Sequence, residues 1–160
     1  MMGTEIGLAT VHACRITVVY LSVYAAAIIM QVYVQKKLYF RARSVTKQGN
    51  SKPKSFDRYE SPEMLHADRA VGNMLEWMPC FLGLLWVLVA MDKFQVPGEG
   101  GFSLSYHAAW SHVGFRALYV ILIHWHGVPL DGWHSSLLVS TYPAYVCLIM
   151  LYAEAIMVLW

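Results

Sequence analysis

The 160-residue chain contains four mainly apolar segments with few or no charged residues. An α-helix rises 1.5 Å per residue, so about 20 apolar residues cross the roughly 30 Å of bilayer hydrocarbon. Residues 16–35 and 132–153 are uncharged runs of that length. Residues 77–91 are also uncharged, but they reach the length of a membrane span only together with the polar turn before them. Residues 100–130 contain one charged residue, Arg116. The pattern therefore predicts a single domain over residues 1–160 with four membrane-spanning helices. We place them at about 10–35, 65–91, 103–125 and 134–159.

The composition supports an integral membrane protein. Hydrophobic residues make up 58% of the chain and charged residues 14%, with a mean hydropathy of +0.44. Soluble domains carry about 25% charged residues. This composition excludes a disordered chain, a nucleic-acid-binding arm and a small disulfide-stapled secreted module. The fold class that we predict is all-α, a bundle of four transmembrane helices with membrane lipids as neighbours and no nucleic-acid partner.

The positive charges are concentrated in one loop. The net charge is only +2, yet eight of the twelve Lys and Arg residues lie between Lys36 and Arg58. By the positive-inside rule this loop faces the cytoplasm and both termini lie on the other side. We expect the membrane to be that of the endoplasmic reticulum or another organelle. By themselves, basic residues such as Arg41 and Arg43 are typical of a solvated or lipid-headgroup-binding face.

Ionisable residues within the spans are functional candidates, because charges in a bilayer are costly and usually face a partner or a cavity. Glu76 and Arg116 fall at similar depths in the second and third predicted helices. We therefore expect Glu76 to neutralise Arg116. Arg15 and Glu154 both fall near the opposite surface, so we expect them to form a separate outer pair.

Polar residues also share helix faces. Arg69, Asn73 and Glu76 are spaced i, i+4, i+7, which puts them on one side of the second helix. His112, Arg116 and Tyr119 repeat the spacing on the third. The two faces predict a polar cleft that opens toward the basic side.

Two other interpretations of these faces stay open. Polar faces in helical bundles often serve only to hold neighbouring helices together. Alternatively, His107 and His112 are ligands of a pigment or haem. No Cys or His spacing predicts a metal site.

Three segments resemble a known family. Residues 69–79, RAVGNMLEWMP, resemble the R-A-x-x-N-x-x-E-x-x-P signature that opens the second helix of the MAPEG family, the membrane-associated proteins in eicosanoid and glutathione metabolism. Residues 114–119, GFRALY, resemble the R-x-x-Y element of its third helix. Gln31 with Lys36 and Lys37 resembles the end of its first helix, with Lys in place of Arg.

This resemblance implies a homotrimer that holds glutathione, as a co-substrate, between subunits at the cytoplasmic side. Glutathione carries two carboxylates, an ammonium group and a thiol. The resemblance assigns the carboxylates to Arg69 and to Lys36 or Lys37. It assigns the ammonium group to Glu76 and the peptide backbone to Asn73.

The catalytic residues that the resemblance implies are Arg116 and Tyr119. In the eicosanoid-synthase members, an Arg near the start of the fourth helix stabilises the thiolate, but no Lys or Arg follows Arg116 here. Arg116 is one substitute for that cation, and His126 or His134 is another. The predicted function is that of a glutathione-dependent transferase or peroxidase acting on an apolar electrophile or hydroperoxide. The alternative is a non-catalytic subunit that binds lipid or acts as a scaffold in a larger membrane assembly.

Overall fold

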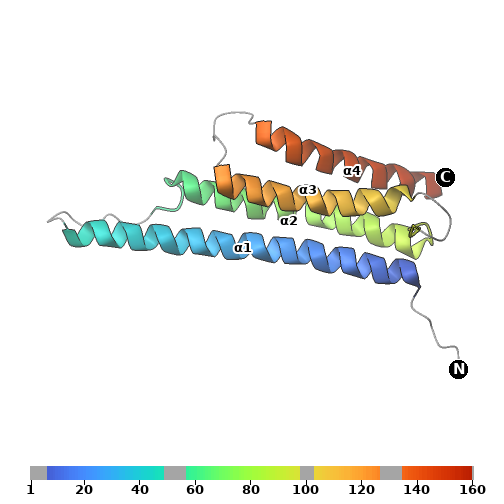
Figure 1. The fold of residues 1–160 in the computed structure, drawn as a ribbon, viewed down its shortest axis with the longest axis horizontal. Helices are drawn as coiled ribbons and strands as arrows, with labels where there is room; N and C mark the ends of the chain where they lie inside the picture. Colours follow the sequence, from blue (N-terminus) through green and yellow to red (C-terminus); the bar gives the residue numbers. More distant parts are fainter. Residues whose placement is uncertain (1–6, 49–56, 98–102, 127–134, 160) are drawn as a thin grey trace, which may run out of the picture.

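The protein folds into four long helices that lie side by side (Figure 1). The computed structural model describes residues 7–48, 57–97, 103–126 and 135–159. The helices are α1 (Leu8–Gln48), α2 (Pro62–Ala90), α3 (Leu104–His126) and α4 (Ser135–Leu159). The predicted four-helix all-α architecture is therefore confirmed.

The two middle helices, α2 and α3, join the bundle together. Each of them contacts the other three helices, whereas α1 and α4 do not contact each other within the described residues. Figure 1 shows α1 along one side, α4 along the other, and α2 and α3 between them. Groups on α2 and α3 that face inward are consequently enclosed on both sides.

Three of the described helices contain segments long and apolar enough to cross a membrane, which makes the protein a multi-pass membrane protein. These segments are Leu8–Ser44, Pro62–Ala90 and Leu138–Met157. Helix α3 falls short by hydropathy because it carries polar residues such as His112 and Arg116, which are buried inside the bundle.

Two helix boundaries differ from the prediction. Helix α1 continues to Gln48 instead of ending near residue 35, which gives it 41 residues and a length of about 60 Å. No Pro or Gly interrupts residues 36–48, and the Lys, Arg, Leu and Ala among them are good helix formers. Helix α2 begins at Pro62 because Ser61 caps it, accepting a hydrogen bond from the Met64 N–H.

An aromatic column fixes the middle of the bundle. The Tyr20 and Phe81 ring centroids lie 5.0 Å apart, and those of Phe81 and His112 lie 4.4 Å apart. The Tyr20 hydroxyl donates to the Met74 carbonyl at 3.0 Å, and His112 Nδ1 lies 2.9 Å from the Ala144 carbonyl. In hydrocarbon, polar groups need such internal partners. His112 is fully buried in this column, where its ring stacks on that of Phe81.

Candidate functional site

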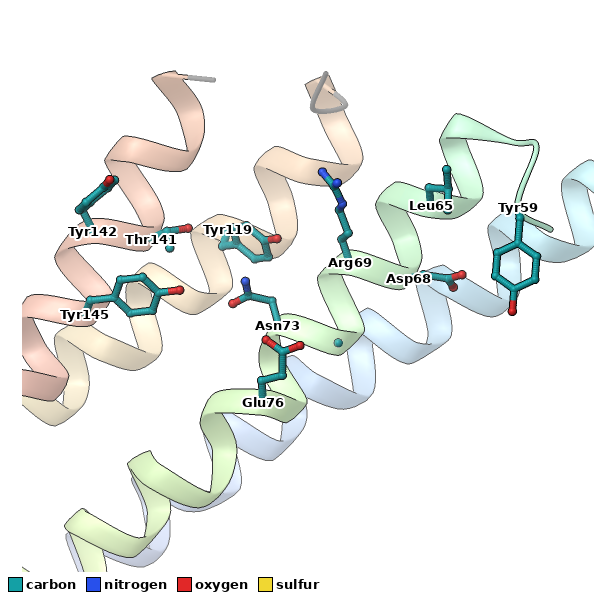
Figure 2. Close-up of a pocket in the computed structure, with 11 residues that line it drawn as sticks. Tyr59, Leu65, Asp68, Arg69, Asn73, Glu76, Tyr119, Thr141, Tyr142 and Tyr145 are labelled. Atoms are coloured by element: carbon teal, nitrogen blue, oxygen red, sulfur yellow. The ribbon is translucent and has the colours of Figure 1, made fainter. Parts of the chain in front are cut away.

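A cavity of about 880 Å³ lies along α2, with α3 and α4 as its further walls (Figure 2). This volume lies in the usual range for small-molecule sites. It is lined by Tyr59, Leu65, Asp68, Arg69, Gly72, Asn73, Glu76, Tyr119, Thr141, Tyr142 and Tyr145. The structure thus brings together four residues that the sequence singled out: Arg69, Asn73, Glu76 and Tyr119.

Helix α2 places opposite charges at two depths of this cavity. Arg69 and Glu76 are seven residues apart, which is about 10 Å along the helix axis. In Figure 2, Arg69 points toward the end of the bundle where α2 begins, whereas Asn73 and Glu76 lie deeper and face Tyr119 and Tyr145. A cation and an anion at this separation complement an elongated ligand that carries both charges.

Arg116 lies behind the wall of the cavity. Its side chain is fully buried, with 0% of its surface exposed. Its Nη1 donates a hydrogen bond to the Asn73 carbonyl oxygen, and its Nε and Nη2 have no hydrogen-bond partner among the described residues. The guanidinium carbon lies 5.3 Å from the Tyr145 ring centroid and 5.9 Å from that of Trp77, within the range of cation–π contacts.

Within the part of the chain that the structure describes, no carboxylate balances the charge on Arg116. Among the described residues no ion pair includes Arg116, and the expected pair with Glu76 does not form. Asn73 takes the position that we expected of Glu76, and the Glu76 side chain is exposed. An isolated buried charge is strongly unfavourable unless it is paired or hydrogen-bonded, so Arg116 is the most unusual group of the site.

The expected outer pair of Arg15 and Glu154 is also absent. Arg15 is exposed on α1, whereas one carboxylate oxygen of Glu154 on α4 is buried without a partner. The prediction was wrong because α2 and α3 separate the helices that carry the two residues.

The lysines Lys36 and Lys37 lie outside this cavity within the protomer. Lys36 is exposed on α1. Lys37 Nζ lies 3.5 Å from a Glu63 carboxylate oxygen, and Arg41 Nη1 lies 3.3 Å from the other. The side chains of His126 and His134 fall outside the described part of the chain.

Helix α4 contributes cavity residues that sequence reasoning missed. Thr141, Tyr142 and Tyr145 supply hydroxyl groups from a strongly apolar helix, and Thr141 Oγ1 is buried without a hydrogen-bond partner. The i, i+4 spacing of Thr141 and Tyr145 within an apolar run is the signal that could have identified them.

An ion pair attaches the segment of residues 57–61, the connector that precedes α2, to α2 itself. Arg58 donates to both carboxylate oxygens of Asp68, at 2.6 and 2.9 Å, and Gln31 donates to the same carboxylate at 2.7 Å. The hydrogen bond to Asp68 raises the pKa of the Arg58 guanidinium above its usual value. This network joins α1, the connector and α2, and it holds Tyr59 at the edge of the cavity.

These features define a class: an integral membrane protein with four helices and a charged cavity within the bundle. The sequence profile of the MAPEG family matches residues 13–157, nearly the whole chain. The chain belongs to the MAPEG family. A search of curated proteins and a search of solved structures each gave no significant match.

Proposed function

We propose that the protein binds glutathione in this cavity and uses its thiol to conjugate an apolar electrophile or to reduce an apolar hydroperoxide. The observation that carries the proposal is the arrangement of the cavity wall. Arg69, Asn73, Glu76 and Tyr119 line one space, and the uncompensated charge of Arg116 lies directly behind Asn73.

The charges of the cavity suit the ends of glutathione. Arg69 binds a carboxylate and Glu76 binds the ammonium group, both through charge-assisted hydrogen bonds. Asn73 lies between them along α2 and bonds the peptide backbone. The tyrosines of α4 flank the remaining volume.

Arg116 and Tyr119 act on the sulfur. A free thiol of this type has a pKa of about 8.5, and a neighbouring cation lowers it. Arg116 supplies the positive charge from behind the wall, and the Tyr119 hydroxyl donates a hydrogen bond to the thiolate. The thiol proton leaves to solvent, and the thiolate forms a C–S bond with the electrophile. Either a leaving group departs with its electron pair, or an activated double bond opens and the resulting anion takes a proton from solvent. With a hydroperoxide, two glutathione molecules are oxidised to the disulfide, while the peroxide is reduced to an alcohol and water.

A second carboxylate requires a second cation, which points to an oligomer. Within the protomer, Arg69 is the cation that lines the cavity among the described residues. In the homotrimer that we propose, the exposed Lys36 of a neighbouring subunit binds the other carboxylate. Lys37 is less suited to this role because Glu63 already pairs with it.

A non-catalytic, lipid-binding or scaffolding role is the second candidate. It is favoured by the absence of any Lys or Arg after Arg116 in the sequence. Helix α4 consequently offers the cavity hydroxyl groups but no cation of its own.

Glutathione binding to the purified protein tests the proposal. Calorimetry on the wild type should give saturable binding, and Arg69→Ala should weaken it about 10-fold, since a hydrogen bond to a charged group contributes about 1.5–3 kcal/mol. Arg43→Ala is the matched control because Arg43 is exposed on the extension of α1, away from the cavity. A wild type that binds no glutathione would rule out the enzyme and favour the scaffold.

A further inference from the structure

A second cavity, of about 480 Å³, lies at the end of the bundle where α2 begins. It is enclosed by α1, α2 and α3 and has no lining residue in common with the first cavity. Its lining residues are Met30, Tyr33, Val34, Lys37, Pro62, Glu63, His66, Ile123, His124 and Trp125. The electrophile of the proposed reaction must reach the sulfur in the first cavity, so the second cavity is not the site of that reaction.

The second cavity combines an apolar wall with an aromatic rim. Met30, Val34 and Ile123 form the apolar part, and the first two belong to the membrane-spanning segment of α1. Tyr33 and Trp125 are 68% and 80% exposed. Tyr and Trp are enriched where membrane proteins meet the headgroup layer. The cavity is thus suited to a molecule that has both an apolar and a polar part.

Positive charge exceeds negative charge around the polar part of the cavity once Arg41 is counted, which contacts the lining residue Glu63 from outside the cavity. Glu63 is shared by Lys37, at 3.5 Å, and Arg41, at 3.3 Å. One carboxylate therefore serves two cations. Pro62 and Glu63 also belong to the first turn of α2, where the helix dipole adds partial positive charge.

His124 provides an independent indication of a ligand. Its Nδ1 lies 2.8 Å from the Val120 carbonyl, which makes Nδ1 the donor and leaves Nε2 to find another partner. Nε2 is buried, and no described residue forms a hydrogen bond with it. A hydroxyl or protonated phosphate oxygen would satisfy it.

We infer that this second cavity binds an acidic phospholipid from the leaflet on the basic side of the membrane. The phosphate replaces Glu63 as the partner of Lys37 and Arg41, and an acyl chain lies against Met30 and Val34. A soluble phosphate would use the same cations but would leave the apolar wall and the aromatic rim uncovered.

Lipid retention by the full-length protein tests this inference. The protein is placed in nanodiscs of phosphatidylcholine with a minor share of phosphatidic acid, extracted into detergent, and its bound lipid is counted by native mass spectrometry. The wild type should retain phosphatidic acid selectively. Lys37→Gln should lower this retention about fivefold, which corresponds to the contribution of one basic residue at a charged membrane surface.

The variant Glu63→Gln distinguishes the loss of a lipid contact from damage to the fold. It removes the competing carboxylate, so it should raise the retention of phosphatidic acid, whereas a variant that only damages the fold would lower it. The matched control, Arg43→Gln, removes a charge of the same helix extension outside the cavity and should leave retention unchanged.

Three results would overturn the inference. The first is a wild type that retains phosphatidylcholine as readily as phosphatidic acid. The second is an equal loss in Lys37→Gln and Arg43→Gln, which would indicate diffuse charge attraction. The third is displacement of the lipid by glycerol 3-phosphate at the concentration at which a short-chain phosphatidic acid displaces it, which would identify a site for small phosphates.

Discussion

Two arginines that contact α2, Arg58 and Arg116, differ in their burial and in the partners of their positive charge. Arg58 lies in the connector before α2, with its side chain 41% exposed and both oxygens of Asp68 within hydrogen-bond distance. Arg116 is fully buried on α3, where it contacts one amide oxygen and two aromatic rings and, among the described residues, no carboxylate. The exposed cation has a carboxylate as its partner, whereas the described part of the chain offers the buried one only neutral groups.

This difference separates a structural contact from a candidate functional one. An exposed ion pair contributes about 0–1 kcal/mol to stability, and its loss changes little. A buried charge without a counter-ion costs several kcal/mol. We propose that an anion, the glutathione thiolate, supplies the negative charge that the described residues do not offer to Arg116.

The largest effect should follow from Arg116→Met, which removes the charge and keeps most of the volume. Conjugating activity should fall about 10²-fold, the usual loss when a group that stabilises a developing anion is removed. The free energy of unfolding should stay the same or rise, because apolar residues of similar volume often replace buried charges without loss. Both quantities are measured on the same preparation. Retained activity together with a destabilised fold would assign Arg116 to packing.

A second variant should give Arg116 a carboxylate partner, as Arg58 already has. Asn73→Asp places a carboxylate where Arg116 now finds an amide oxygen. The internal ion pair should compete with the thiolate and reduce activity about 10-fold, since hydrogen bonds to charged groups contribute about 1.5–3 kcal/mol. Asn73→Ser is the control that adds no charge. Equal activity in Asn73→Asp and the wild type would argue against any anion-binding role of Arg116.

Glu76→Gln should give an intermediate effect on binding alone. Loss of the negative charge should raise the KM for glutathione roughly 10-fold, which corresponds to the lower end of the range for a hydrogen bond to a charged group. An analogue of glutathione that lacks the amino group should bind the variant and the wild type equally. If the analogue is affected as strongly as glutathione, Glu76 does not contact the ammonium group.

The smallest effect should come from Arg58→Ala. Because the Arg58–Asp68 pair is partly exposed, we expect a loss of at most about 1 kcal/mol in the free energy of unfolding. The bond to Asp68 raises the pKa of Arg58, so the stabilisation from this arginine is complete at neutral pH. It is lost as strongly alkaline pH deprotonates Arg58, or as strong acid protonates the carboxylate that it contacts. Thermal unfolding at several pH values near neutrality checks both points. A loss that grows between mildly acidic and mildly alkaline pH would contradict them.

Most of the fold could be predicted from the sequence because membrane-spanning helices are recognisable by their length and apolar composition. The sequence also predicted the residues of one wall, because Arg69, Asn73 and Glu76 lie on a single helix whose geometry fixes their spacing. The end of α1 was missed, since a helix that leaves the hydrocarbon continues for as long as its residues favour it.

Partnerships between helices were harder to predict. Similar depth suggested the pair of Glu76 and Arg116, but depth does not say which turn of α2 faces α3, and Asn73 faces it instead. Similar depth also suggested Arg15 and Glu154, although the order of helices around the bundle keeps them apart. The packing of the whole molecule determines how each helix is rotated about its axis and which helices are its neighbours. The spacing of residues along one helix carries no information on either.

A base titration of glutathione bound to the purified protein, followed by the ultraviolet absorbance of the thiolate, shows whether Arg116 stabilises that anion. We expect the bound thiol to ionise well below the pKa of about 8.5 typical of a free thiol, and Arg116→Met to return it to that value. Bound glutathione that ionises like free glutathione in the wild type would show that Arg116 does not stabilise the thiolate.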